Sequence, residues 1–144
     1  MNQNVKFVLF LGLIVALLSG CKYEEGPFFS LQSREDRIAG IWKVAYATDS
    51  EGEENTTSYE DLTFIFGEDF SAEAELETSL GTIEFDGTWD LSQDDAVFQL
   101  EDLELPLGIA SFDEDFDILR LTEDEFWLRD QQDSLSVIHL EAIL

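Results

Sequence analysis

The sequence predicts an all-β protein: an eight-stranded antiparallel up-and-down barrel preceded by a short helical turn. Three observations favour this architecture. Beyond residue 40, apolar and polar residues alternate with a period of two, and helix-period stripes are absent. Polar links of hairpin length separate the alternating segments. A flat sheet of eight strands would leave long apolar edges, so closure into a barrel is favoured.

Length and composition indicate a single folded domain. The chain has 144 residues, of which 12% are aromatic, and this richness in aromatic residues argues against disorder. Its 33 acidic residues outnumber 7 basic ones and give a net charge of -26. Because binding to phosphates needs a basic surface, this balance excludes nucleic acid as a partner.

The first 20 residues have the pattern of a signal peptide. Lys6 supplies a positive charge, and the apolar stretch from Phe7 to Leu18 is too short to span a membrane. The stretch ends in Leu-Ser-Gly-Cys at residues 18–21, which resembles the lipobox of bacterial lipoproteins. The resemblance implies that Cys21 is acylated, becomes the first residue of the mature protein and anchors it in a membrane.

Residues 21–32 are expected to form the lipidated cysteine and a tether. Residues 22–25, Lys-Tyr-Glu-Glu, resemble a tag that exports some lipoproteins to the cell surface in certain Gram-negative lineages; a plain acidic linker is the alternative, and both stay open. Gly26 and Pro27 then interrupt regular structure. Cys21 is the only cysteine, so the chain cannot form an internal disulfide or a thiolate zinc site.

The folded domain, residues 33–144, begins with a predicted helical turn. Ser33 is an N-cap residue placed before early acidic residues, and Gly40 ends the segment as a C-cap glycine would. The first predicted strand follows at residues 41–46 and places Trp42 and Tyr46 on one face.

Four more strands are predicted at residues 62–66, 70–76, 83–91 and 96–100. In the second of these, alanine and leucine alternate with serine and glutamate, so the inner and outer faces are unambiguous. Gly87 within a strand predicts a bulge or a sharp bend. Residues 103–109 contain a proline and a glycine and predict an apolar loop.

Three last strands, at residues 116–121, 126–129 and 135–142, complete the predicted barrel. Large apolar side chains on the inward faces form the candidate ligand-binding interior: Trp42, Val44, Tyr46, Phe64, Phe66, Phe85, Trp89, Phe98 and Phe126. The same alternation predicts that Leu62, Phe70 and Leu76 also point inward. An eight-stranded barrel is wide enough either to be filled by side chains or to hold one small ligand, and both alternatives stay open.

A family resemblance rests on three segments. Gly40-Ile41-Trp42, after a short helix and at the start of a strand, resembles the Gly-x-Trp signature of lipocalins. With residues 87–91 (Gly-Thr-Trp-Asp-Leu) and 121–128 (Leu-Thr-Glu-Asp-Glu-Phe-Trp-Leu), it resembles the lipocalin-like domains of small bacterial outer-membrane lipoproteins. The resemblance implies a calycin-like barrel with Trp42 packed at its closed end. The second and third lipocalin signatures are not clearly present, so the resemblance predicts the fold more than a lipocalin ligand cavity or a function.

The candidate chemical groups do not predict an enzyme, a cofactor or a metal site. Asp113, Asp115 and Asp117 have the spacing that starts an EF-hand loop, but Ile118 stands where the loop needs glycine, so a solvated turn is expected. Paired carboxylates could suggest a glycosidase, but among 33 acidic residues pairs arise by chance. His139 is the single histidine, which excludes a multi-histidine metal site.

Two functions remain open. The first is a lipid-anchored binding module of the bacterial outer membrane that holds a small apolar ligand in the barrel. The second is a structural or interaction lipoprotein with a filled barrel, which docks onto an envelope protein complex through an acidic face or the loop at residues 103–109. A hollow interior predicts the first, and a filled interior predicts the second.

Overall fold

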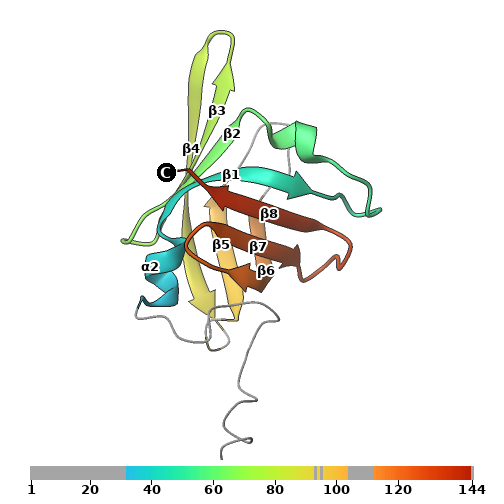
Figure 1. Cartoon of the computed structure of the whole chain (residues 1–144). Coiled ribbons are helices and arrows are strands. Elements are labelled where there is room, and N and C mark those ends of the chain that lie inside the picture. The colour runs from blue at the N-terminus through green and yellow to red at the C-terminus, as the bar shows by residue number, and fades with distance from the viewer. Residues whose placement is uncertain (1–31, 93, 95, 104–111, 144) are drawn as a thin grey trace, which may run out of the picture.

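The computed structural model describes residues 32–92, 94, 96–103 and 112–143. Their eight strands form a closed barrel in which each strand pairs antiparallel with its neighbour in sequence, and the last strand pairs with the first (Figure 1). The predicted fold class is therefore confirmed. The strands are β1 (Gly40–Ala47), β2 (Leu62–Phe66), β3 (Ser71–Thr78), β4 (Gly81–Ser92), β5 (Val97–Leu103), β6 (Phe112–Leu121), β7 (Glu125–Asp130) and β8 (Val137–Ala142).

Helix α2 (Arg34–Ile38) lies at one end of the barrel, directly before β1 (Figure 1). Ser33 and Asp36 form a capping box, in which each side chain accepts a hydrogen bond from the backbone N–H of the other. The Trp42 indole Nε1 donates to the carbonyl oxygen of Ile38 (2.8 Å), and an Arg37 guanidinium nitrogen donates to that of Leu121 (3.1 Å). These bonds fix the helix to both β1 and β6.

The hairpin of β3 and β4 extends past the rest of the barrel wall (Figure 1). Its register runs without a break from Ser71 opposite Thr88 to Thr78 opposite Gly81. Leu80 at its tip is 98% exposed. β4 is the longest strand described, because its second half, from Thr88 onward, pairs with β5.

The register shifts of the barrel lie between Val44 and Tyr46, between Leu100 and Leu103, and between Ile118 and Arg120. Of the two alternatives predicted at Gly87, a bulge or a sharp bend, the bulge does not form in the pairing with β3, which passes through Gly87 without a register shift. Glycine is needed there for another reason. A Cβ atom at Gly87 would lie 2.6 Å from the backbone oxygen of Glu101, so only glycine allows this approach of β4 to β5.

Two elements differ from the sequence-based expectation. A 3-10 helix, η1 (Thr56–Tyr59), precedes β2 and buries Tyr59. β6 begins at Phe112, so the solvated turn expected at residues 113–117 is instead part of a strand. The apolar loop predicted at residues 103–109 falls almost entirely outside the described residues. In the part of the chain that the structure describes, no helix has the length and apolar character needed to cross a membrane.

Candidate functional site

The interior of the barrel contains a cluster of aromatic rings, and six of the nine predicted interior residues belong to it. Their rings touch one another in a continuous series, with Phe98 at the centre. The Phe98 ring centroid lies 5.3 Å from that of Phe66 and 5.1 Å from that of Phe126, in edge-to-face geometry. All six side chains are at most 3% exposed: Trp42, Phe64, Phe66, Trp89, Phe98 and Phe126.

Further apolar side chains complete the same core. They lie on β5 to β8, where register shifts after Leu100 and after Ile118 interrupt the period of two. They are Leu100, Leu103, Phe116, Ile118, Leu121, Leu128, Ile138 and Leu140, with Phe116 as the one aromatic member. Two predicted interior residues, Val44 and Phe85, are half-buried and pack against this core.

The cavity within this interior is very small. Eight apolar residues line it: Phe64, Phe66, Phe98, Leu100, Phe116, Leu128, Ile138 and Leu140. Its volume of about 10 Å³ is close to the space that one water molecule needs. No buried side-chain nitrogen or oxygen of the described residues lacks a hydrogen-bond partner. This cavity among the described residues is therefore too small for a ligand and has no polar lining residue.

Tyr46 does not point into the barrel, and this prediction is wrong. The register shift between Val44 and Tyr46 inserts one residue, so the alternation reverses and Ala47 becomes the buried residue. Tyr46 is 37% exposed on the outer wall. The prediction for Phe70 is also wrong, because the residue lies in the turn before β3 with φ of 65° and is 43% exposed.

Tyr46 instead belongs to a row of side chains across the outer wall of β6, β7, β8 and β1. Arg120 is paired with Trp127, Trp127 with His139, and His139 with Tyr46. The Trp127 and His139 rings stack with centroids 4.2 Å apart, and the Arg120 guanidinium lies 5.1 Å from the Trp127 ring centroid. Burial lowers the pKa of His139, while nearby Glu125 raises it to a smaller extent. The row confirms His139 as a residue of the barrel wall.

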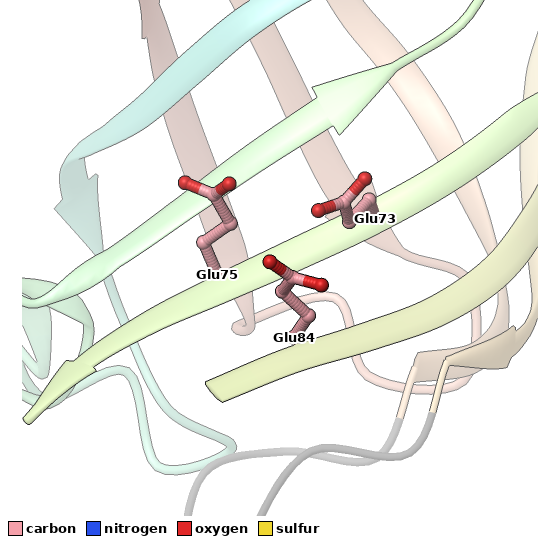
Figure 2. A group of neighbouring side chains, drawn as sticks. All are labelled: Glu73, Glu75 and Glu84. Carbon is pink, nitrogen blue, oxygen red and sulfur yellow. The ribbon is translucent and has the colours of Figure 1, made fainter. Parts of the chain in front are cut away.

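A group of three carboxylates lies on the outer wall of β3 and β4 (Figure 2). Oxygen atoms of Glu73, Glu75 and Glu84 lie within 4.8 Å of one another, because Glu75 is paired with Glu84 across the two strands. Burial raises the pKa of Glu73, and the charges of Glu84, Glu75 and Asp86 add to this shift. The three side chains stand on the exposed outer wall of two strands, and this arrangement is that of a solvated acidic face.

Asp115 and Asp117, two of the acidic residues that resemble the start of an EF-hand, lie in β6 and have protein partners. Asp115 accepts a hydrogen bond from the Gln99 side chain (2.8 Å). Asp117 forms an ion pair with Arg129 (3.0 Å) and accepts a hydrogen bond from Gln131 (2.8 Å), and these bonds lower its pKa. The carboxylates of both residues thus have protein partners on the outer wall. Cys21, the signal peptide and the tether lie outside the described residues.

Two hollows mark the outer wall on the side of β4, β5 and β6. One has a volume of about 370 Å³ and is lined by Phe70, Thr88, Trp89, Asp90, Gln99 and Glu101. The other, of about 250 Å³, is lined by Leu100, Glu101, Glu114, Asp115, Gln131 and Gln132. Both are far larger than the interior cavity, and Glu101 lines both of them. The sequence shows the polar residues involved but not that a turn brings Phe70 beside them.

Comparison with known proteins supports the fold and leaves the function open. No family model and no curated protein matches the sequence. Among solved structures, a lipocalin-like protein from Bacteroides uniformis is similar, with a TM-score of 0.56 and 16% sequence identity. The match covers 74% of this chain and 99% of that protein. The likeness shows that the two chains share a lipocalin-like barrel.

Proposed function

We propose that this chain is a lipid-anchored, lipocalin-like recognition module of the bacterial outer membrane. Its barrel interior is filled by its own side chains, and it binds an envelope protein through its outer wall. Residues 1–20 direct export, Cys21 carries the acyl chains, and residues 21–32 tether the barrel to the outer membrane. The anchored protein is displayed at the cell surface if residues 22–25 act as an export tag. The protein performs no chemistry of its own.

The small size of the interior cavity among the described residues is the observation that carries this proposal. Barrels of eight strands hold a ligand only where the lumen stays open, and a drug-sized ligand needs a pocket of about 300 Å³ or more. The interior cavity has about 10 Å³ and an entirely apolar lining. The outer hollows are larger by more than an order of magnitude and combine polar and apolar residues. Recognition is therefore assigned to the outside of the barrel.

The absence of a catalytic role is proposed on the arrangement of the titratable groups. Catalytic acids and bases converge in a cleft with shifted pKa values. In the described part of the chain, the single histidine is stacked against Trp127 on the outer wall. The carboxylates with shifted pKa values, Asp69, Glu73 and Asp117, lie on separate elements.

Native mass spectrometry of the full chain in neutral detergent tests the filled barrel. We expect the mass of the acylated protein alone and no saturable quenching of tryptophan fluorescence by a fluorescent fatty acid. A bound small molecule in the barrel, or one-to-one quenching, would show that the alternative with an interior ligand is correct.

Metabolic labelling with an alkyne fatty acid tests the anchor. The wild-type protein should incorporate the label and sediment with outer membranes, whereas the Cys21→Ala variant should do neither, because stable anchoring needs more than one acyl chain. Labelling or membrane sedimentation of the Cys21→Ala variant would contradict the assignment of the lipobox.

A further inference from the structure

The larger outer hollow lies over β4 and β5 and has polar walls from both strands. Thr88 is paired with Glu101, and Asp90 is paired with Gln99. Paired residues of neighbouring strands point to the same face of a sheet, and the alternating residues Trp89 and Leu100 are buried inside the barrel. The four polar side chains thus project together from the outer wall into a hollow of about 370 Å³.

Phe70 adds an aromatic surface to this hollow. Its ring centroid lies 5.0 Å from that of Trp89, and the side chain is 43% exposed. Its backbone φ of 65° is rare for a bulky residue. Two backbone hydrogen bonds hold it there, from Phe70 N to Gly67 O (3.1 Å) and from Trp89 N to Phe70 O (3.0 Å). The turn therefore presents one face of a phenyl ring to solvent at a fixed position.

The polar groups of the hollow mainly accept hydrogen bonds. The Gln99 side-chain nitrogen donates to an Asp115 carboxylate oxygen (2.8 Å), which leaves the Gln99 amide oxygen as an acceptor. The carboxylate of Asp90 accepts from the backbone N–H of Leu91 (2.7 Å) through one of its two oxygens. With Glu101, the hollow has two carboxylates beside an aromatic ring, and no lysine or arginine is among the residues that line it.

The second hollow continues this surface toward β6. It has Glu101 in common with the first hollow and adds the carboxylate of Asp115 and the amides of Gln131 and Gln132. Glu114 also lines it, but this residue is paired with the buried Leu100, so its side chain belongs to the inner face of the sheet. Its lining also has no basic side chain. We call the two hollows together the outer groove. Its two hollows meet at Glu101 and are lined by residues of β4, β5 and β6, so they can receive more than one side chain of a bound segment.

We propose that the outer groove binds an extended, arginine-bearing segment of the partner protein. A guanidinium lies against the Phe70 ring and donates hydrogen bonds to the carboxylates of Asp90 and Glu101, and a second basic side chain enters the hollow beside Asp115. Guanidinium is the group that fits, because it is planar, stacks on aromatic rings and donates to two oxygens in a fixed geometry. The inference rests on the proposed function, since it names the partner chemistry of the outer wall.

Binding of a labelled peptide to the full chain in neutral detergent tests this proposal. The probe is fluorescein-Gly-Arg-Gly-Arg-Gly, followed by fluorescence anisotropy at constant salt. The Asp90→Asn/Glu101→Gln variant should weaken binding about tenfold, because it removes two charge-assisted hydrogen bonds. Phe70→Ser should weaken it about threefold through loss of the stacking surface.

A matched control separates the groove from the overall negative charge. The Glu75→Gln/Glu84→Gln variant removes the same charge from the acidic face of β3 and β4 (Figure 2), and binding should change by less than about twofold because exposed distant charges are screened. A probe with citrulline in place of arginine should not bind.

Several results would overturn the inference. Equal losses in the two double variants would show attraction by net charge alone, and an unchanged affinity of Phe70→Ser would remove the aromatic surface from the site. Absence of saturable binding, or equal competition by spermidine, would exclude an arginine-bearing segment. None of these results bears on the filled interior, which native mass spectrometry tests separately, so the failure of this inference and that of the proposed function are distinguishable.

Discussion

Truncation of the central aromatic ring measures how far the interior depends on close packing. Phe98 is fully buried, and its ring contacts those of Phe66, Trp89 and Phe126 at centroid distances of 5.3, 6.0 and 5.1 Å. Replacing a buried phenylalanine by alanine costs about 3–5 kcal/mol, because transfer energy is lost and a cavity remains. For a domain of this size that corresponds to a fall in Tm of roughly 12–20 °C.

The matched variant is Tyr46→Ala, since alternation alone places both aromatic residues inside the barrel. Tyr46 is 37% exposed and contacts His139 on the outer wall, so its truncation should cost about 1 kcal/mol. Thermal and urea unfolding, followed by tryptophan fluorescence, give both values. Similar losses in the two variants would refute the register assigned to β1. A loss below about 1 kcal/mol in Phe98→Ala would refute the filled interior.

The remaining predictions concern backbone space and charge. Gly87→Ala should lower the free energy of unfolding by about 1–3 kcal/mol, because its Cβ would meet a backbone oxygen at 2.6 Å. Gly40→Ala, whose Cβ would meet side-chain atoms at 3.5 Å, should lower it by about 0.5 kcal/mol or less. Urea unfolding measures both values, and equal losses would contradict the close approach of β4 to β5. Burial lowers the pKa of His139 in the folded protein, so the unfolded chain binds this proton more tightly. The stability contributed by neutral His139 is therefore complete above about pH 6.5 and should fall as the pH drops toward the folded-state pKa. His139→Gln should flatten this part of the plot of Tm against pH, and an unchanged slope would exclude the effect. The pKa of Glu73 is raised in the folded protein, so ionisation of Glu73 destabilises the fold as the pH rises through that pKa. Glu73→Gln should therefore raise Tm at neutral pH more than Glu77→Gln does. Equal gains in Tm would argue against the carboxylate cluster.

The sequence predicted the strands well because their two faces differ sharply. In β3, alanines face the interior and glutamates face solvent, so no other register buries the apolar residues. In β2, the buried and half-buried residues alternate from Leu62 to Phe66, as the sequence predicts. Hairpin-length links then determine the order of the strands, and closure removes the free edges.

Features that depend on a single inserted residue could not be predicted. The bulge beside Tyr46 reverses the alternation of β1 without any glycine or proline to mark it. The turn before β3 turns Phe70 outward, although the residue continues the alternation of its strand. Both errors concern aromatic side chains that the sequence assigns to the interior and the structure places on the outer wall. The candidate binding surface of Phe70 therefore becomes visible only in three dimensions.

The proposed binding through a polar outer wall has consequences for the kind of partner that can bind. The net charge of -26 repels anionic surfaces over about 8–10 Å at ordinary salt, so approach to nucleic acids or anionic lipid headgroups is unfavourable. The same field attracts a basic segment from every direction and raises its rate of association. A net charge of this kind raises the rate of association but does not distinguish one basic segment from another. Selectivity needs a position where geometry matters. The proposed site in the outer groove supplies one, because a phenyl ring and the carboxylates of Asp90 and Glu101 together favour a guanidinium over other cations.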